Sequence, residues 1–234
     1  MKRYLVTGAT SGLGLSILHA LRERGDAVFA IGRDIARLTG RLGSTCIAEV
    51  DLSDLAATTQ AVRDAGTFDG LIHCAGAELV APLRLTTDEQ YRTAMMAADS
   101  AFAILRAAAS KGVMADGGSI VLMSSVAAHR GTAGMAAYSA SKAAIEGMAR
   151  SAAVDLAARR IRVNCVAAGA FLSPMHDRIT KRMPEAGQDA YAAAHPLGIG
   201  EVAAVRDAVL HLLSDAARWT TGTVVVVDGG YLAH

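Results

Sequence analysis

Three residues late in the chain have the types and the spacing of a proton-transfer site. Ser125 ends an apolar run, Tyr138 lies thirteen residues later, and Lys142 follows after four more. Residues at i and i+4 share one helical face, so the phenol and the ammonium can face the same cleft. A nearby ammonium favours the phenolate and lowers a phenol pKa from its ordinary value of about 10. We therefore predict that Tyr138 gives a proton to a carbonyl oxygen, or takes one from an alcohol, while Ser125 holds that oxygen by a hydrogen bond.

Each of these residues also has a plainer interpretation. Tyr138 can be a half-buried helix residue, Lys142 a solvated one, and Ser125 a cap-like residue at the end of a strand. The plain interpretation does not explain why all three occur after one strand at the carboxyl edge of a sheet, where open α/β folds bind ligands.

The elements that must position these residues alternate along the chain. Short β-rich runs alternate with helices of about 10–20 residues, which is typical of βαβ units and of a doubly wound parallel sheet. Several runs are apolar at consecutive positions, as in strands that are covered on both faces. Strands are expected at 3–7, 27–31, 46–50, 70–75, 119–125, 161–167 and 223–228, and helices at 12–24, 34–41, 53–65, 88–110, 137–159 and 201–214.

Composition agrees with one domain spanning all 234 residues, since no linker or repeat divides the chain. Apolar residues make up 52% and charged residues 19%, which allows a well-buried core. The net charge of +1 gives no sign of a nucleic-acid or membrane partner. Three cysteines without C-x-x-C spacing indicate reduced thiols, and no signal peptide or membrane span is apparent, so we expect a cytoplasmic protein. The histidines lack metal-ligand spacing, and we expect no metal.

A glycine-rich turn, "LVTGATSGLGLSIL", joins the first strand to the first helix. Gly8, Gly12 and Gly14 let the backbone approach a pyrophosphate, which the helix N-terminus then binds through its N–H groups. The plainer interpretation is a tight strand-to-helix turn, but a strand before and an amphipathic helix after favour dinucleotide binding. Thr10, Ser11 and Leu13 complete the predicted turn site. In such a site Lys142 would also bind the nicotinamide ribose.

Arg33 follows Gly32 at the tip of the second strand, where an acidic residue would bind the ribose 2′-hydroxyl of NAD. A guanidinium there can pair with the 2′-phosphate of NADP, so we predict NADP(H) ahead of NAD(H). In the alternative interpretation Arg33 is solvated and Asp34 binds the ribose. Asp51, with Leu52 beside it, either accepts a hydrogen bond from the adenine amino group or belongs with Ser53 to the cap of the next helix.

Residues 170–198 break the alternation of strands and helices and hold three of the four prolines. A long insertion after a late strand is often a lid over a site, and we expect one here with two short helices. Its large apolar side chains either contact an apolar part of the substrate or pack the lid onto the body: Phe171, Leu172, Met175, Met183 and Tyr191. His129 and Arg130 either touch a polar substrate group or face solvent.

Taken together, these motifs resemble those of the short-chain dehydrogenase/reductases, over nearly the whole chain. "TGATSGLG" resembles the family turn T-G-x-x-x-G-x-G, and Ser125, Tyr138 and Lys142 have the family spacing. "RIRVNCVAAGAF" is similar to the motif of the sixth strand, and the C-terminal region is similar to that of 3-oxoacyl-carrier-protein reductases. The resemblance implies a Rossmann-like sheet of seven strands in the order 3-2-1-4-5-6-7, NAD(P)-dependent carbonyl–alcohol chemistry, and a homotetramer or homodimer. It also places cofactor contacts at Cys74, Ala75, Gly76, Gly169, Phe171 and Ser173.

The chain departs from the family pattern at three places. "HCAG" puts His73 and Cys74 where the family has two asparagines, and Ala168 precedes Gly169 in place of proline. The family's fourth catalytic residue, an asparagine whose main-chain carbonyl helps to hold a water behind the lysine, aligns with Ala97 or Ala98. Asp99 or Ser100 can substitute for it, and we expect a slower enzyme or an altered proton relay before an inactive one.

These observations predict an oxidoreductase that reduces a ketone or a 3-oxoacyl group to an alcohol, or catalyses the reverse reaction. The substrate is expected to be a small molecule or an acyl thioester. The missing asparagine motivates an alternative, a non-catalytic dinucleotide-binding protein with a regulatory or scaffold role. The intact Ser125, Tyr138 and Lys142 argue against that alternative. A dehydratase or epimerase of a longer family branch is disfavoured by the spacing of the turn and the short C-terminal part.

Overall fold

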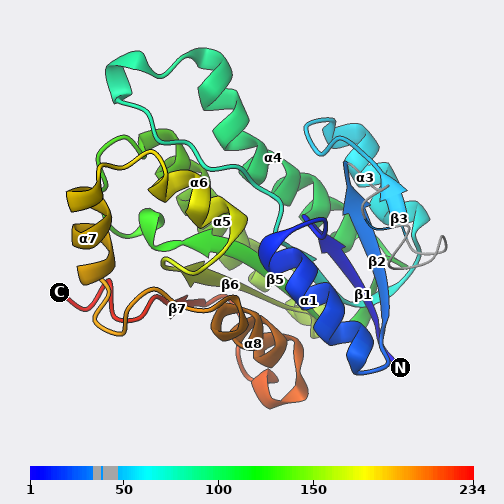
Figure 1. The fold of residues 1–234 in the computed structure, drawn as a ribbon. Coiled ribbons are helices and arrows are strands. Elements are labelled where there is room, and N and C mark those ends of the chain that lie inside the picture. Colours follow the sequence, from blue (N-terminus) through cyan, green and yellow to red (C-terminus); the bar gives the residue numbers. More distant parts are fainter. Residues whose placement is uncertain (34–37, 39–46) are drawn as a thin grey trace.

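The computed structural model describes residues 1–33, 38 and 47–234 (Figure 1). Seven parallel strands form one sheet in the order β3-β2-β1-β4-β5-β6-β7, which confirms the predicted fold class. The strands are β1 (Arg3–Thr7), β2 (Ala27–Gly32), β3 (Ile47–Glu49), β4 (Phe68–His73), β5 (Met114–Ser125), β6 (Arg162–Ala168) and β7 (Val224–Val227). The helix expected at 34–41 falls, apart from Leu38, outside the described residues, as do Asp34 and Cys46.

The helices follow the predicted pattern closely. They are α1 (Gly12–Glu23), α3 (Leu55–Asp64), α4 (Asp88–Ala109), α5 (Ala136–Asp155), α6 (Pro174–Thr180), α7 (Glu185–Ala193) and α8 (Val202–Leu213). The expected helix at 137–159 ends at Asp155, and a 3-10 turn at Ala157–Arg159 follows it. In the described parts of the chain, no helix is both long and apolar enough to cross a membrane.

The register of the sheet brings the strand ends that matter to one edge. Thr7 pairs with His73 across β1 and β4, and Ser125 pairs with Ala168 across β5 and β6. Because all neighbouring strands run parallel, their carboxyl ends open on the same side. The glycine-rich turn, the loop after β4, Ser125 and the start of the 170–198 segment therefore meet at one place.

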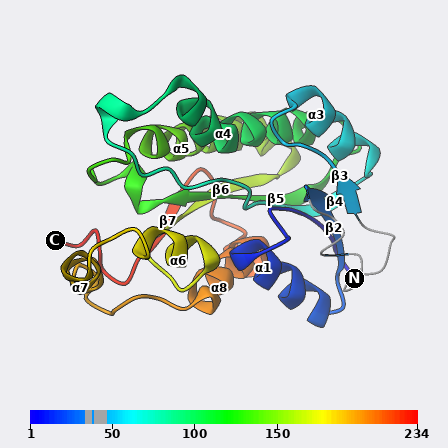
Figure 2. The ribbon, with the colours of Figure 1, turned by 45° about the horizontal axis from the view of Figure 1, so that its top comes forward.

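Helices cover both faces of the sheet (Figure 2). α3, α4 and α5 lie on one face, and α1, α8 and the short helices α6 and α7 lie on the other. Successive strand residues therefore alternate between two cores: Leu71 and Ile120 pack under α4 and α5, while Ile72 and Val121 pack under α1 and α8. This explains the consecutive apolar positions in the sequence. Most alanines of α4 belong to the first core.

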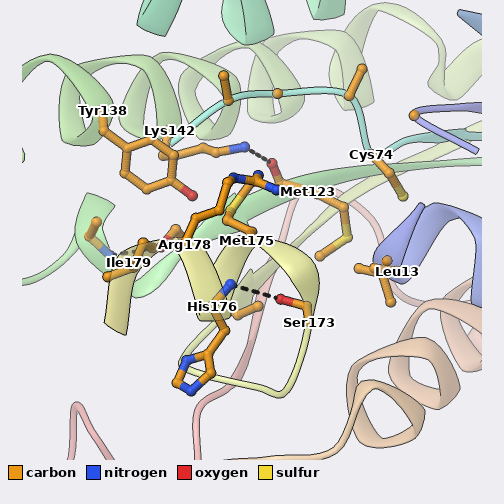
Figure 3. Close-up of a pocket in the computed structure, with 18 of the residues that line it drawn as sticks. Leu13, Cys74, Met123, Tyr138, Lys142, Ser173, Met175, His176, Arg178 and Ile179 are labelled. Carbon is orange, nitrogen blue, oxygen red and sulfur yellow. Dashed lines mark hydrogen bonds between the residues drawn. The ribbon is translucent and has the colours of Figure 1, made fainter. Parts of the chain in front are cut away.

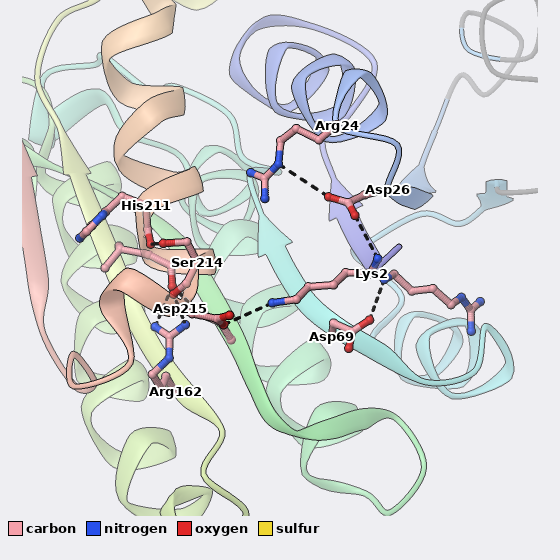
Figure 4. A network of polar contacts seen from close by, with 11 residues as sticks. Lys2, Arg24, Asp26, Asp69, Arg162, His211, Ser214 and Asp215 are labelled. Carbon is pink, nitrogen blue, oxygen red and sulfur yellow. Dashed lines mark hydrogen bonds and ion pairs between the residues drawn. The ribbon is translucent and has the colours of Figure 1, made fainter.

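A polar network closes the opposite edge of the sheet (Figure 4). Arg162, at the start of β6, is only 9% exposed and donates from Nη1 to the carbonyl of Leu212 at 2.7 Å and from Nη2 to that of Ser214 at 3.2 Å. These are carbonyls at the C-terminus of α8, which lack partners within the helix. Ser119 on β5 donates to the same Leu212 carbonyl at 2.9 Å. The arginine therefore ties α8 to the sheet.

We expect Arg162→Met to lower the free energy of unfolding by about 2 kcal/mol, since hydrogen bonds from a charged donor contribute about 1.5–3 kcal/mol. Urea denaturation followed by circular dichroism measures the change. Arg218→Met, at an exposed arginine just beyond the same helix, is the matched control and should leave the midpoint unchanged. Equal stability of the two variants would show that Arg162 does not anchor α8.

Candidate active site

A cavity of about 800 Å³ opens at the carboxyl edge of the sheet. Every residue predicted from the sequence to be catalytic or to bind the cofactor lines it, from Gly8 in the first turn to Ser173 at the start of α6. These residues come from seven separate segments of the chain, and the parallel register is what brings them together. Among the described residues, no three His, Cys, Asp or Glu side chains lie close enough to hold a metal ion.

The glycine-rich turn packs so closely that side chains would not fit. Gly8 has φ of 67°, and a Cβ on it would lie 2.8 Å from the backbone nitrogen of Ala75. A Cβ on Gly14 would overlap the carbonyl oxygen of Gly8. Ser11 begins α1, and within the described part of the chain its side chain makes no capping hydrogen bond. The first amides of α1 are therefore available to an anion, and the turn fits a pyrophosphate.

The expected adenosine end of the cavity has an exposed Arg33 on its rim. Asp51 accepts hydrogen bonds from the backbone nitrogen and hydroxyl of Ser53, at 2.9 and 2.8 Å. These bonds, with a smaller contribution from Arg33, hold the pKa of Asp51 below its ordinary value. The expectation that Asp51 and Ser53 cap the next helix is wrong, because Asp54 caps α3 by accepting from Ala57 at 2.9 Å.

Ser125, Tyr138 and Lys142 line the same cavity. Figure 3 shows Tyr138 and Lys142, which both extend from α5. Ser125 is the last residue of β5, and its hydroxyl accepts a hydrogen bond from the Ala127 amide at 3.2 Å, so the cap-like interpretation of this serine is also correct. Tyr138 and Lys142 lie one turn apart near the start of α5, and both are buried. The Lys142 Nζ atom lies 5.6 Å from the centre of the Tyr138 ring and donates to the Met123 carbonyl at 2.9 Å.

Burial controls the protonation of both groups. It raises the pKa of Tyr138 to about 12, against the opposing effect of a hydrogen bond with Ser125 and with a further increase from the Glu78 carboxylate. It lowers the pKa of Lys142 to about 8. Among the described residues, Lys142 is not one of the groups that shift the pKa of Tyr138. The predicted lowering of the Tyr138 pKa is therefore absent from this structure.

His73 is a fully buried bridge at the end of β4. The Ala75 amide donates to the Thr7 hydroxyl at 3.3 Å, and Thr7 lies 2.8 Å from His73 Nδ1. Thr7 then donates to Nδ1, and Nε2 carries the proton and donates to the Ala97 carbonyl at 3.0 Å. The Ser100 hydroxyl lies 3.3 Å from the same nitrogen. His73 thus donates a hydrogen bond to the main-chain carbonyl of Ala97, one of the two positions that align with the family asparagine.

The structure also decides between the proposed substitutes for that asparagine. Asp99 is exposed on the outer side of α4, so the expectation that it can take over the role is wrong. Ser100 is buried beside His73, and its hydroxyl donates to the Met96 carbonyl at 2.7 Å. A Cβ on Gly76 would lie 3.3 Å from Ala97 Cβ and 3.6 Å from Lys142 Nζ, so Ala97 and the ammonium share one small space.

The His73 bridge should make stability depend on pH. Burial lowers the pKa of His73 from 6.5 to about 4, a difference that corresponds to roughly 3 kcal/mol. The unfolded chain binds the proton more readily, so this stabilisation is complete above pH 6.5 and is lost as pH falls from 6.5 toward 4. We expect the stability difference between the wild type and His73→Gln to shrink over that range in urea titrations.

His211→Gln provides the control, because His211 is exposed on α8. Its difference from the wild type should stay small at every pH. A His73→Gln difference that does not change between pH 7.5 and pH 4.5 would contradict a neutral, buried imidazole.

The expectations for substrate contacts were partly wrong. Phe171, Met175, Met183 and Tyr191 line the cavity, but Leu172 is 49% exposed and is not among the residues that line it. His129 and Arg130 neither face the cavity nor simply extend into solvent. His129 Nε2 pairs with Glu146 at 2.9 Å, and Arg130 donates to the Tyr231 carbonyl at 2.8 Å.

Two side-chain pairs near the cavity were missed by the sequence analysis. Arg178 on α6 binds Glu78, in the loop after β4, through two hydrogen bonds of 2.6 and 2.9 Å. Glu146, one turn beyond Lys142, accepts a hydrogen bond of 2.6 Å from Ser124. Glu78 and Arg178 are 100 positions apart, so no local spacing could have revealed their contact. The i+4 step from Lys142 to Glu146 was the one available signal for the second pair.

The chain is similar to known proteins along almost its whole length. A family model described as enoyl-(acyl carrier protein) reductase matches residues 8–232. L-xylulose reductase from Bos taurus is 35% identical over 238 residues, which cover 99% of this chain and 97% of that protein. The chain belongs to the short-chain dehydrogenase/reductase family. It is thus an NAD(P)-dependent oxidoreductase, in agreement with the prediction. Carbonyl reductase [NADPH] 2 from Sus scrofa is also 35% identical, over 240 residues that cover 99% of this chain and 96% of that protein.

Solved structures of short-chain dehydrogenase/reductases share the fold. One from Mycobacterium ulcerans has a TM-score of 0.90 and 31% identity, covering all of this chain and 90% of that one. A blue fluorescent protein from a metagenomic library, solved with NADPH, has a TM-score of 0.87 and 30% identity, covering 98% and 97% of the two chains. A 4-hydroxyisoleucine dehydrogenase solved with NADH has a TM-score of 0.89 and 25% identity, covering both chains fully. Structures similar to this short-chain dehydrogenase/reductase have thus been solved with NADPH and with NADH.

Proposed function

We propose that this short-chain dehydrogenase/reductase uses NADP(H) to reduce the carbonyl group of a small molecule, with Tyr138 as the proton donor. The observation that carries the proposal is the convergence of Ser125, Tyr138 and Lys142 on the cavity that also contains the glycine-rich turn. When bound, a nicotinamide dinucleotide would supply the hydride. The turn would hold its pyrophosphate, and Lys142 would hold its ribose.

The protonation state of Tyr138 suits the role of proton donor. With a pKa of about 12, Tyr138 is protonated at neutral pH and can give its Oη proton to a carbonyl oxygen. The Ser125 hydroxyl accepts from the Ala127 amide and hydrogen-bonds to Tyr138, so a carbonyl oxygen that enters between the two hydroxyls can accept from both. In the reverse reaction the same Tyr138 oxygen, as the phenolate, would take the proton from the alcohol.

Two features support a small carbonyl compound as the substrate. Met175, Ile179 and Met183 give the cavity an apolar wall beside Tyr138. The relatives include proteins named for the reduction of a sugar ketone and of carbonyl compounds. A 3-oxoacyl group stays a second candidate because the family model is named for carrier-protein chemistry. A cytoplasmic location and a homotetramer or homodimer also stay predictions; exposed Phe102 on α4 and Val154 on α5 would suit contacts between subunits.

Removing one hydroxyl tests the proposed proton donor. We expect Tyr138→Phe to lower kcat at least about a hundredfold, because a positioned general acid contributes 10²–10⁴. The assay follows NADPH oxidation with ketoses, cyclic ketones, quinones and β-keto thioesters. NADPH affinity, measured by fluorescence titration, should change little. Tyr91→Phe is the matched control, since Tyr91 is exposed on α4, and it should keep wild-type activity.

If NADPH binds tightly while no carbonyl in the panel is reduced, and Tyr138→Phe changes nothing, the proposed reaction is wrong. The non-catalytic alternative would then stand.

Arg33 tests the choice of cofactor. A guanidinium on the 2′-phosphate makes hydrogen bonds worth about 1.5–3 kcal/mol, so Arg33→Gln should weaken NADPH binding about ten- to a hundredfold and leave NADH binding nearly unchanged. Titrations with both cofactors measure the ratio. Lys111→Gln, which removes a distant exposed cation, should change neither affinity. A loss of affinity that is equal for NADPH and NADH would contradict recognition of the 2′-phosphate by Arg33.

A further inference from the structure

The C-terminal tail packs against the 170–198 segment, beside α7 (Figures 1 and 2). The Asp228 carboxylate folds the tail into a turn by accepting from the Gly230 amide at 2.9 Å and from the Leu232 amide at 2.8 Å. The Leu197 amide donates to the Gly229 carbonyl at 3.0 Å. The tail is therefore an ordered part of the wall of the cavity, and Tyr231 lines that wall.

One imidazole joins the two ends of the 170–198 segment. His195 is 3% exposed, and its Nε2 accepts from the Ala170 amide at 3.3 Å. An accepting Nε2 places the proton on Nδ1, which then donates to the Tyr191 carbonyl at 2.9 Å. Ala170 begins the segment and Tyr191 lies in α7 near its end, so His195 closes the segment into a loop.

The tail connects this imidazole to the loop between β5 and α5. The Tyr231 ring stacks on His195, with ring centres 4.7 Å apart and an angle of 25°. The Arg130 guanidinium lies 4.6 Å from the centre of the Tyr231 ring and also donates to the Tyr231 carbonyl at 2.8 Å. A cation within about 6 Å of an aromatic ring is attracted to it. The same β5–α5 loop carries Thr132 and Met135, which line the cavity.

We propose that His195 and Arg130 are positioning residues that, through Tyr231, hold the 170–198 segment over the substrate. We call these three residues the tail brace. The proposal rests on the proposed function, because it assumes that a carbonyl substrate binds beside Tyr138. Arg130 does not itself line the cavity, and in this proposal its effect on the substrate passes through Tyr231 and His195. The brace should therefore set substrate affinity and leave the chemistry at Tyr138 unchanged.

Arg130→Met removes the charge and the donor but keeps much of the side chain. We expect KM for the carbonyl substrate to rise roughly tenfold, as for the loss of a hydrogen bond from a charged group, while kcat and NADPH affinity stay within about twofold. Arg130→Lys, which keeps a charged donor, should recover part of the loss. Arg218→Met is the control for a lost surface arginine.

A second measurement needs no substrate. Hydrogen exchange followed by mass spectrometry should show faster exchange in residues 170–198 of Arg130→Met and His195→Phe than in the wild type. The double variant should exchange little faster than His195→Phe alone, because both changes break one brace. This measurement distinguishes the two proposals. If the wild-type protein reduces no carbonyl compound but the variants show the expected exchange pattern, the proposed function is wrong and the tail brace is still supported.

Unchanged exchange in 170–198 in both variants would overturn the proposal. So would a fall in kcat at constant KM, which would place Arg130 in the chemistry. If Arg130→Met does not fold, the same comparison is made with Arg130→Lys, for which an intermediate exchange rate is expected and a wild-type rate together with a wild-type KM would overturn the proposal.

Discussion

The parallel register of the sheet is the constraint on which the rest of the molecule depends. Because β1, β4, β5 and β6 run in one direction, Thr7, His73, Ser125 and Ala168 all reach the same edge. The connections that leave this edge supply everything else at the cavity. A shift of one residue in the pairing of β5 would turn Ser125 from one face of the sheet to the other, since side chains alternate along a strand. The two cores, which place alternate residues of each strand on opposite faces, fix that register.

Burial is the second physical theme of the cavity. It moves Tyr138, Lys142 and the neighbouring His73 toward their neutral forms, raising the pKa of Tyr138 and lowering those of Lys142 and His73. The groups respond differently because their partners differ. His73 has both ring nitrogens in hydrogen bonds and is neutral, whereas the Lys142 ammonium donates to the Met123 carbonyl and lies near the Tyr138 ring. An ammonium has three donors, so further ones are left for the proposed contact with a ribose. A neutral phenol suits the delivery of a proton to a carbonyl.

Contacts between segments that are distant in the sequence hold together the elements around the cavity. Glu78 and Arg178 join the loop after β4 to α6, and Glu146 joins α5 to both Ser124 and His129. Arg130, the next residue, joins the same loop to the C-terminal tail. The sequence left open whether His129 and Arg130 contact the substrate or face solvent. In the structure, His129 binds α5 and Arg130 binds the C-terminal tail, so both residues anchor the loop between β5 and α5.

The sequence alone determined the fold class, the glycine-rich turn and the trio of Ser125, Tyr138 and Lys142, because each depends on local spacing: alternating strands and helices, glycines in one turn, and an i, i+4 pair on one helix. It also identified the departures at His73 and Ala97. Only the tertiary structure decided what those departures do, because the bond from His73 to the Ala97 carbonyl joins β4 to α4. It also decided the protonation of Tyr138, since a pKa depends on how completely the surrounding segments exclude water. The same holds for His195 and Tyr231, whose contacts form only when the end of the chain folds back onto a segment that begins some 60 residues earlier.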